Sequence, residues 1–382
     1  MTTMAIDNKD KKVLNVPHLR FPEFSGEWEN TELQYIAPNI CSGKDKPTSN
    51  GTVALYGSTG IIGMTRLASY NEEIVLVARV GANAGQLQIT TIPCGVTDNT
   101  LIINAKEWNR YIYYYLQHYN LNRLVFGSGQ PLITGSMLKK LKIIYGEESE
   151  RNKIVNLLCL LDERIATQNK IIYKLKSLIR GIMVELQKRG LSNGTWKKVL
   201  LSNVLTERNE LNKSLYPVYS VSVIQGIVNQ MEYLGRSFAA SDTSKYHVVH
   251  YGDLVYTKSP TGSFPYGIIK QSYNQNEVAV SPLYGVYEPK TFSTGVFLHE
   301  YFKSELNTLN YLHPLVQKGA KNTINIANQR FLESYVAIPS NANELLAISK
   351  LLCSLNTKLE FLQNILKQSQ GQKQYLLRQM FI

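Results

Sequence analysis

The stretch Asn156-Leu-Leu-Cys-Leu-Leu-Asp162 returns as Lys350-Leu-Leu-Cys-Ser-Leu-Asn356, with four of the seven residues identical. The two cysteines lie 194 residues apart (353 − 159 = 194). Upstream, Gly26-Glu-Trp28 is matched by Gly194-Thr-Trp196 at an offset of 168 (196 − 28 = 168). The two halves share their beginnings and ends and differ in the middle, which indicates an internal duplication. Chance similarity between leucine-rich helices is the alternative, and the matching Gly-x-Trp openings count against it.

The first repeat sits in a long segment, residues 147–189, which contains no proline and one glycine. Its seam positions alternate in steps of four and three, which is the spacing of a coiled coil. At ~1.5 Å per residue the helix would be roughly 50 Å long, and its narrow apolar stripe requires a partner helix. The seam consists of Ile154, Leu158, Leu161, Ile165, Gln168, Ile172, Leu175, Ile179, Ile182 and Leu186.

The partner helix is predicted at an offset of 194 residues, and its seam is Ile348, Leu352, Leu355, Leu359, Leu362, Leu366, Ser369, Lys373, Leu376 and Met380. Ser369 and Lys373 weaken this seam, so we expect the helix to fray or bend near Gly371. Two matched helices in one chain favour intramolecular pairing, because the effective concentration is high. Pairing between two chains is the alternative.

These patterns predict an α+β protein in which two pseudo-repeated α/β domains are joined by two long antiparallel coiled-coil helices. The predicted segments are a tail (1–17), module one (18–145), a central helix (146–190), module two (191–339) and a C-terminal helix (340–382). Strands are expected at Glu73–Arg79, Thr100–Ile103 and Gly252–Lys258. Residues 108–119 are expected to form a helix whose tyrosines belong to the core.

Lys and Arg number 41 against 29 Asp and Glu, a net charge of +12. Such a surplus favours a polyanion, either nucleic acid or an anionic membrane face, although solubility or partner docking would also account for it. The four cysteines never form a C-x-x-C pair, which argues against a zinc ribbon and a disulfide framework. Without an apolar run of membrane-spanning length or a signal peptide, we expect a cytoplasmic protein that does not enter a membrane.

The sequence motifs of common catalytic sites are missing. There is no G-x-x-x-x-G-K-[ST] phosphate loop and no G-x-G-x-x-G that follows a strand and opens a helix. His299-Glu300 lacks the second histidine of a zincin, and the other histidines do not cluster at metal spacing. An Asn-Pro-Pro-aromatic signature is also lacking. We therefore expect neither catalysis nor a metal site in this chain.

Loops that carry small, amide and cationic residues suit DNA, because glycine lets the backbone approach closely and Arg, Asn and Gln read base edges. Ordinary surface turns are the competing interpretation of each loop. The residues predicted to contact DNA are Lys44, Lys46, Arg66, Arg79, Asn83 and Gln130 in module one, and Lys258, Thr261, Ser263, Lys270, Lys321 and Asn322 in module two.

The entry Pro17-His-Leu-Arg-Phe-Pro-Glu-Phe24 runs into Gly26-Glu-Trp28, and Leu138-Lys-Lys-Leu-Lys-Ile-Ile144 leads into the first long helix. Together with the repeats, this order resembles the DNA specificity subunit of Type I restriction–modification systems over nearly the whole chain. Two features depart from the pattern, Tyr145-Gly-Glu in place of a proline-containing exit and Lys373 in the second helix.

The resemblance implies two target-recognition domains that each read one half of a bipartite, asymmetric DNA site, with helices that set the spacing. It also implies double-stranded DNA, two methyltransferase subunits and two motor-nuclease subunits as partners. The methyltransferase would hold S-adenosylmethionine, and the motor would use ATP and Mg²⁺, so this chain would need no cofactor. The helices would pair through Ile154, Leu158, Leu161, Ile165, Ile172 and Leu175 with Leu352, Leu355, Leu359, Leu362 and Leu366.

Two other functions stay open on the sequence alone. A coiled-coil scaffold without DNA readout would bind its partners insensitively to salt, whereas phosphate contacts weaken steeply with salt. A free-standing DNA-modifying enzyme would show activity as the purified chain.

Overall fold

The computed structural model describes residues 15–125, 131–236, 239–318 and 324–382. The chain divides into two compact units, which we call unit 1 (Met1–Asn169 with Asn364–Ile382) and unit 2 (Lys170–Gln363). Each unit combines small β-sheets with helices, so the α+β class predicted from the sequence is confirmed. The finer division into tail, modules and spacer helices stays a prediction, because each compact unit also includes part of both long helices.

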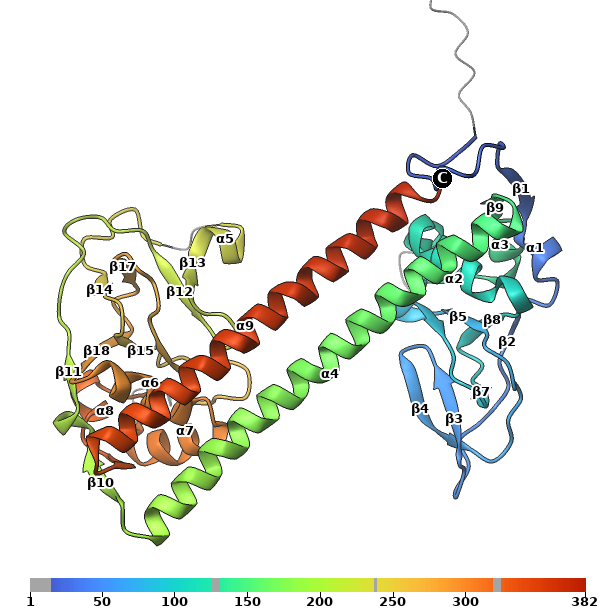
Figure 1. The fold of residues 1–382 in the computed structure, drawn as a ribbon. Helices are drawn as coiled ribbons and strands as arrows, with labels where there is room; N and C mark the ends of the chain where they lie inside the picture. The colour runs from blue at the N-terminus through green and yellow to red at the C-terminus, as the bar shows by residue number, and fades with distance from the viewer. Residues whose placement is uncertain (1–14, 126–130, 237–238, 319–323) are drawn as a thin grey trace, which may run out of the picture. The chain divides into compact units, whose positions relative to one another are not determined.

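The two long helices are α4 (Glu148–Ser192) and α9 (Ala342–Gln379), drawn as continuous ribbons in Figure 1. In unit 1, Asp162 near the start of α4 binds Lys373 near the end of α9, with 2.6 Å between Oδ1 and Nζ. In unit 2, Ile179 near the end of α4 shares a buried cluster with Ile348 near the start of α9. Within each unit, α4 and α9 run in opposite directions (Figure 1). None of the eleven residues expected to pair them is exposed.

The expected bend near Gly371 is wrong, since α9 continues to Gln379. Lys373 does not disrupt the helix because its ammonium group binds Asp162 and lies 5.3 Å from the centre of the Tyr114 ring. Ser369 is also accommodated inside, where it is almost fully buried. Contacts in the folded protein thus override a weak seam in the sequence.

Unit 1 is built around a four-stranded antiparallel sheet in the order β2-β8-β5-β6. A three-stranded sheet, β4-β3-β7, and the pair β1-β9 complete its strands. The strands are β1 (Glu29–Glu32), β2 (Cys41–Ser42), β3 (Val53–Gly57), β4 (Gly60–Thr65), β5 (Val75–Ala78), β6 (Leu87–Ile89), β7 (Cys94–Val96), β8 (Thr100–Ile103) and β9 (Lys142–Tyr145). The helices are α1 (Leu33–Ile36), η1 (Gly81–Asn83), η2 (Lys106–Trp108), α2 (Asn109–Tyr119), η3 (Leu121–Leu124) and α3 (Gly135–Lys139).

Unit 2 has a four-stranded antiparallel sheet in the order β11-β18-β15-β16, together with strand pairs β10-β21, β12-β13, β14-β17 and β19-β20. The strands are β10 (Trp196–Leu200), β11 (Leu205–Glu207), β12 (Tyr219–Ser222), β13 (Gly226–Asn229), β14 (His247–Val249), β15 (Leu254–Tyr256), β16 (Ile269–Gln271), β17 (Val278–Val280), β18 (Gly285–Pro289), β19 (Gln317–Lys318), β20 (Ile324–Asn325) and β21 (Tyr335–Pro339). The helices are η4 (Leu201–Asn203), α5 (Gln230–Leu234), α6 (Phe292–Phe302), α7 (Glu305–Leu312), η5 (His313–Leu315) and α8 (Asn328–Phe331).

The similarity of the two units extends to the middle of each half, where the sequences differ. Numbered along the chain within each four-stranded sheet, the strands of both sheets stand in the order first, fourth, second, third. In unit 1, β3 pairs in parallel with β7, and in unit 2 Val218, just before β12, forms a parallel bridge with Ala279 of β17. The two units therefore share a strand topology, while their loops differ in length.

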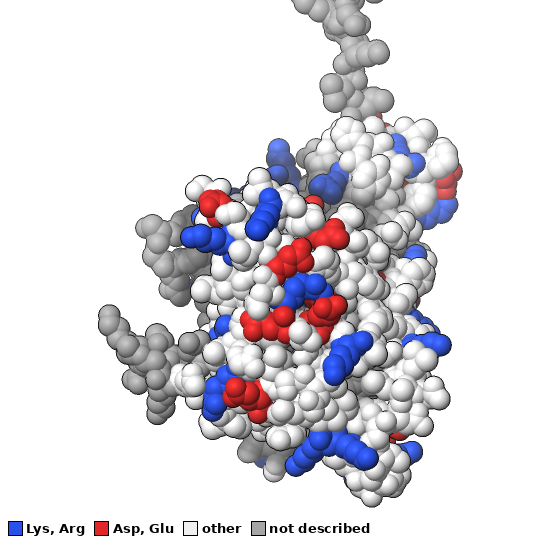
Figure 2. Space-filling view, turned by 90° about the vertical axis from the view of Figure 1, so that its left-hand side faces the viewer, with Lys and Arg blue, Asp and Glu red and all other residues white. Residues whose placement is uncertain are grey.

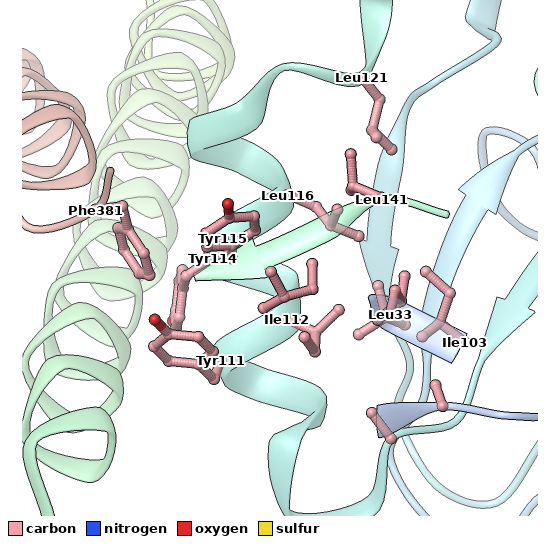
Figure 3. Packing of buried hydrophobic residues seen from close by; sticks show 14 of the residues in the cluster. Leu33, Ile103, Tyr111, Ile112, Tyr114, Tyr115, Leu116, Leu121, Leu141 and Phe381 are labelled. Atoms are coloured by element: carbon pink, nitrogen blue, oxygen red, sulfur yellow. The ribbon is translucent and has the colours of Figure 1, made fainter. Parts of the chain in front are cut away.

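The core of unit 1 gathers around the tyrosines of α2. Tyr111, Tyr114 and Tyr115 are buried, as expected from the sequence. Phe381, just beyond α9, packs with ring centroids 5.5 Å from Tyr111 and 6.0 Å from Tyr115, and Figure 3 shows its ring facing α2. The end of α9 is thus part of this core.

Candidate nucleic-acid interface

Both units contain the same hydrogen bond, made by the tryptophan of the Gly-x-Trp opening. In unit 1 the Trp28 indole Nε1–H donates to Glu150 Oε2 at 3.0 Å. In unit 2 the Trp196 indole donates to Glu344 Oε1 at 2.8 Å. Glu150 and Glu344 stand at the start of α4 and α9, 194 residues apart (344 − 150 = 194). The opening segment of each unit is thereby tied to the first turn of a long helix.

Arg20 is a structural residue that sequence reasoning missed. Its guanidinium donates to both carboxylate oxygens of the buried Glu150, at 2.7 and 2.8 Å, and to the carbonyl of Gly26 at 2.6 Å. These hydrogen bonds to Glu150 raise the pKa of Arg20. The signal was available, because Glu150 and Glu344 are identical at the repeat offset and each needs a partner once buried.

Two of the predicted DNA-contacting residues of unit 1 come together where strands β2 and β5 of its four-stranded sheet end. We call this place the edge of the sheet. Arg79 follows β5, its backbone N–H donates to the carbonyl of Asn99 at 3.0 Å, and its guanidinium reaches Ser42 Oγ at 3.3 Å. Lys44 is exposed in the loop after β2. That loop is held at the same edge, because the N–H of Gly43 donates to the carbonyl of Thr100 at 3.1 Å.

Lys46 and Arg66 lie beside β4. The loop after Lys46 runs along this strand, since the N–H of Thr48 donates to the carbonyl of Met64 at 3.0 Å. Arg66 Nε donates to the carbonyl of Ser49 at 3.0 Å, and both basic side chains are exposed.

Asn83 is exposed at the end of η1. This short helix is held to the segment before α3 by a 3.0 Å hydrogen bond from the N–H of Gly81 to the carbonyl of Pro131. Gln130 lies outside the described residues.

Lys258 occupies the position in unit 2 that Arg79 occupies in unit 1, directly beyond the second strand of the sheet. Tyr256 pairs with both β16 and β18, as Val77 pairs with both β6 and β8. Lys258 has a φ of 61°, a left-handed conformation that costs a residue with a side chain about 1–2 kcal/mol. Burial of its stem lowers the pKa of its ammonium group. Strained backbone of this kind is concentrated at functional sites.

The loop after Lys258 holds Thr261 and Ser263. Thr261 exchanges backbone hydrogen bonds with Phe264, and its hydroxyl donates to the carbonyl of Ser259 at 3.0 Å. Ser263 is exposed and donates to the Glu305 carboxylate. Lys321 and Asn322 lie outside the described residues.

Lys270 is not on a loop, which corrects the placement assumed from the sequence. It lies in the middle of β16, where its side chain is 6% exposed. Burial, reinforced by nearby Lys303, lowers its pKa to about 8. The sequence did not distinguish this strand residue from a surface cation, because the strand is only three residues long and is flanked by glycine and polar residues.

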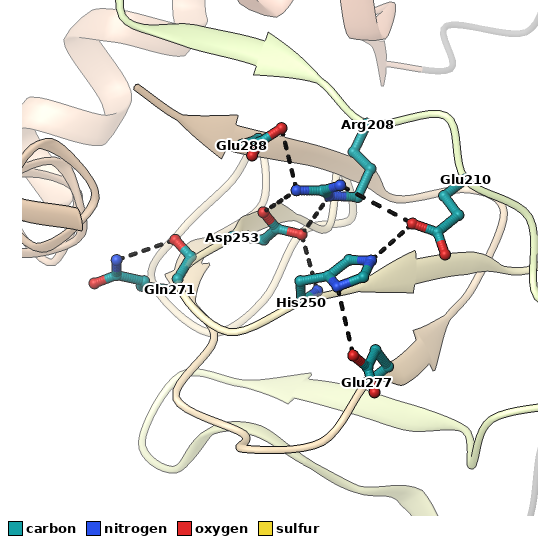
Figure 4. A network of polar contacts seen from close by, with 8 residues as sticks. Arg208, Glu210, His250, Asp253, Gln271, Glu277 and Glu288 are labelled. Carbon is teal, nitrogen blue, oxygen red and sulfur yellow. Dashed lines mark hydrogen bonds and ion pairs between the residues drawn. The ribbon is translucent and has the colours of Figure 1, made fainter. Parts of the chain in front are cut away.

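A polar network on unit 2 shows that part of its surface is unsuited to DNA. Arg208 binds the buried Asp253 at 2.8 and 3.2 Å and Glu288 at 3.2 Å, and His250 binds Glu210 at 2.7 Å (Figure 4). Burial raises the pKa of Asp253, an effect that Arg208 opposes. On the face turned to the viewer in Figure 2, acidic side chains gather around a basic one, while Lys and Arg lie nearer the rim. The basic charge of Arg208 is therefore neutralised locally.

The described residues contain no group of three or more His, Cys, Asp or Glu side chains placed to hold a metal ion. In the same part of the chain, no helix combines the length and apolar character needed to cross a membrane. All four cysteines are free.

Comparison with known proteins finds a family model that matches the first part of the chain. Residues 12–177 match the model described as Type I restriction modification DNA specificity domain. No curated protein sequence matches the chain. Among solved structures, the fold is similar to the S subunit of a Type-I restriction-modification system from M. genitalium, with a TM-score of 0.67 and 15% identity over 96% of this chain and 99% of that chain.

Two further solved chains align over most of their length with lower TM-scores. One comes from a study of complex assembly and conformational transition of the type I R-M system, with 11% identity, coverage of 94% of this chain and 98% of that chain, and a TM-score of 0.44. The other is the HsdS subunit from Thermoanaerobacter tengcongensis, with 12% identity, coverage of 93% and 96%, and a TM-score of 0.34.

Proposed function

We propose that the whole chain is the DNA-reading specificity subunit of a Type I restriction–modification complex. The proposal starts from residues 12–177, which match the model described as Type I restriction modification DNA specificity domain. The observation that carries the proposal beyond residue 177 is the repeated sheet, whose strand order is the same in unit 2 as in unit 1. The same indole–carboxylate hydrogen bond opens both units, which supports two copies of one recognition domain.

In this proposal each unit reads one half of a bipartite, asymmetric site in double-stranded DNA, and the long helices set the spacing and dock two methyltransferase subunits. The chain is the specificity component and performs no catalysis. S-adenosylmethionine would be bound by the methyltransferase, and ATP and Mg²⁺ by motor-nuclease subunits. The net charge of +12 supports a polyanionic ligand. Cytoplasmic localisation stays a prediction.

The side chains proposed to contact DNA are those at the sheet edges and the neighbouring loops. Arg79 suits bidentate readout of guanine, and lysines suit phosphate contacts. In unit 1 they are Lys44, Lys46, Arg66, Arg79 and Asn83, and in unit 2 Lys258, Thr261 and Ser263. Gln130, Lys321 and Asn322 stay predictions, and Lys270 is buried, with 6% of its surface exposed.

The test is selection from a randomised duplex library by the full chain bound to its methyltransferase partner, at two salt concentrations. We expect an enriched motif of two short blocks separated by a fixed gap. Arg79→Ala should relax one block and Lys258→Ala should weaken the other, each by about 1–3 kcal/mol for a base contact and less for a phosphate contact. Arg189→Ala, which removes an exposed helix cation paired with Glu185, is the control and should change neither block.

Two outcomes would contradict the proposal. Absence of any enriched motif, together with binding that does not weaken with salt, would favour the scaffold function. Methylation or cleavage of DNA by the purified chain alone would favour a free-standing enzyme.

A further inference from the structure

The β3–β4 hairpin of unit 1 holds an unusual set of aliphatic side chains in solvent. Ile61 is 55% exposed and Ile62 is 54% exposed, and Met64 and Leu67 are exposed as well. Single exposed aliphatic residues are common on protein surfaces, but here four stand within seven positions, in β4 and just after it. Such a concentration of exposed apolar groups favours a binding surface.

A β-bulge explains how two consecutive isoleucines both face solvent. Leu55 pairs with Gly63 and Tyr56 pairs with Ile61, so Ile62 is an extra residue without a partner in β3. In a regular strand neighbouring side chains point to opposite faces, whereas a bulge re-aims one of them. Gly57 lies directly against the bulge, since a Cβ atom there would stand 2.9 Å from Ile62 Cδ1. The hairpin is therefore shaped to present both isoleucines.

The hairpin is fixed to the edge of the sheet where Arg79 lies. Gln88 of β6 donates to the carbonyls of Gly57 and Ser58 at 2.9 and 3.0 Å. The Ser58 hydroxyl donates to the carbonyl of Asn99, the same carbonyl that accepts the backbone N–H of Arg79. The aliphatic surface and the arginine thus belong to one rigid edge.

Two basic side chains lie beside the exposed aliphatic residues of β4. Lys46 and Arg66 are exposed beside β4, and the neighbouring Asp45 is turned inward, where it accepts hydrogen bonds from the Val96 N–H at 2.7 Å and the Ser69 hydroxyl at 2.6 Å. Asp98, in the turn after β7, is the exposed carboxylate nearest in sequence to this edge. Exposed apolar side chains with cations beside them are suited to bind a polyanion that also carries apolar groups.

Unit 2 has an equivalent hairpin, β12–β13. The first strand of the hairpin in unit 1 pairs in parallel with β7, the strand before β8, and the residue before β12 forms a parallel bridge with β17, the strand before β18. Its turn between Ser222 and Gly226 carries Ile224, which is 84% exposed. In unit 1 the exposed isoleucines lie in β4 just after the turn, and in unit 2 the exposed isoleucine lies within the turn. An exposed aliphatic side chain near the turn of both hairpins, despite different lengths and sequences, points to a shared use.

We propose that these hairpins read DNA by apolar contact with the 5-methyl groups of thymine in the major groove, with Ile61 and Ile62 as specificity-determining residues of unit 1 and Ile224 of unit 2. The inference rests on the proposed function and deepens it. The thymine methyl is the apolar group among the base edges of the major groove, so an aliphatic side chain there selects T·A pairs. The surrounding cations hold the duplex in register through phosphates.

The experiment uses the motif selected by the full chain with its methyltransferase partner. Each thymine of the enriched duplex is replaced in turn by deoxyuridine, which lacks only the 5-methyl group, and affinity is measured at constant salt. We expect roughly fourfold weaker binding at one or more positions in each block, the effect of one buried methyl group. Ile61→Ala and Ile62→Ala should abolish this sensitivity in one block, and Ile224→Ala in the other.

Control variants separate recognition from folding. Ile62→Val keeps a branched aliphatic group and should keep the deoxyuridine effect, and Leu306→Ala removes an exposed leucine of α7 and should change nothing. Unchanged circular dichroism and thermal midpoints would show that the variants fold.

The outcomes distinguish this inference from the proposed function. If a bipartite motif is enriched but deoxyuridine has no effect, or has the same effect in all variants, the hairpin inference is wrong while the specificity function stands. If the isoleucine variants keep the effect but lose the methyltransferase on co-purification, the surface is a protein interface. If no motif is enriched, both proposals fail.

Discussion

The two units make the same tryptophan–glutamate hydrogen bond, but the charges around the glutamate differ. In each, a tryptophan donates a hydrogen bond to a glutamate at the start of a long helix. In unit 1 the carboxylate of Glu150 is buried and is neutralised by two hydrogen bonds from Arg20. In unit 2 the carboxylate of Glu344 stays partly exposed, and the position equivalent to Arg20 (20 + 168 = 188) is the exposed Lys188. The hydrogen bond is common to both units, whereas the charge balance around it differs.

The largest expected change in stability comes from removing Arg20, which tests the charge difference between the units. Arg20→Ala should destabilise unit 1 by about 3–5 kcal/mol, because it leaves a buried carboxylate without its counter-charge. Amide hydrogen exchange of the full chain should show faster exchange in β1 and β9 and unchanged exchange in β10 and β21. Lys188→Ala is the matched control, and a change within about 0.5 kcal/mol is expected for this surface residue. Equal effects of the two substitutions would refute the asymmetry.

A smaller change in the free energy of unfolding is expected from Gly190, which packs against the tryptophan of unit 2. A Cβ atom on Gly190 would lie 2.2 Å from Trp196 Cδ1, so Gly190→Ala should cost about 1–3 kcal/mol through overpacking. Gly181 lies in the same helix with open space around it, and Gly181→Ala should stabilise by about 0.5–1 kcal/mol. Urea unfolding of both variants measures the contrast. Destabilisation by both substitutions would show that the helix, and not the indole, is sensitive.

The smallest expected effect is a pH dependence that differs between the units. Burial lowers the pKa of His299 in unit 2, and its Nδ1 accepts the Gln271 N–H at 2.8 Å, which requires the neutral ring. A pKa below the unfolded value of about 6.5 gives stability that is fully present above that pH and is lost as the pH falls. Between pH 7.5 and 5.5 the loss should be about 1.4 kcal/mol.

His118 of unit 1 provides the comparison. Burial lowers its pKa too, but its Nδ1–H donates to the carbonyl of Leu377 at 2.8 Å, a bond that the charged ring also makes. Urea unfolding at both pH values should show that His299→Asn removes more of the pH dependence than His118→Asn. The reverse order would contradict the assignment of the neutral ring to His299.

The sequence predicted those parts of the fold that depend on local periodicity or on a fixed repeat offset. The seam of α4 and the paired Gly-x-Trp openings are of this kind, because both leave regular spacings in the chain. The shared strand order was not predictable, since strand pairing depends on contacts between distant segments of unlike sequence. The continuity of α9 through Lys373 was misjudged for the same reason, because Asp162 lies about two hundred residues earlier in the chain.

The candidate site was predicted only in part. Arg79 and Lys258 were both predicted to contact DNA, each at the end of an expected strand, and the structure places them at the same point of the repeated sheet. Lys270 was placed on a loop because charge alone does not reveal burial. The exposed Ile61 and Ile62 were passed over, because the bulge that turns both outward depends on the register with β3.

Phe381 and its neighbours have a consequence for the timing of folding. The core of unit 1 includes Leu376, Leu377, Met380 and Phe381, and the Leu19 N–H donates to the carbonyl of Gln379 at 2.8 Å. A chain made from its N-terminus therefore synthesises the sheets of unit 1 first but cannot close that core until these late residues emerge, whereas unit 2 is drawn from one continuous stretch. During translation, unit 1 is the first to be started and the last to be completed, and its unfilled core is the surface that needs protection from aggregation in the interval.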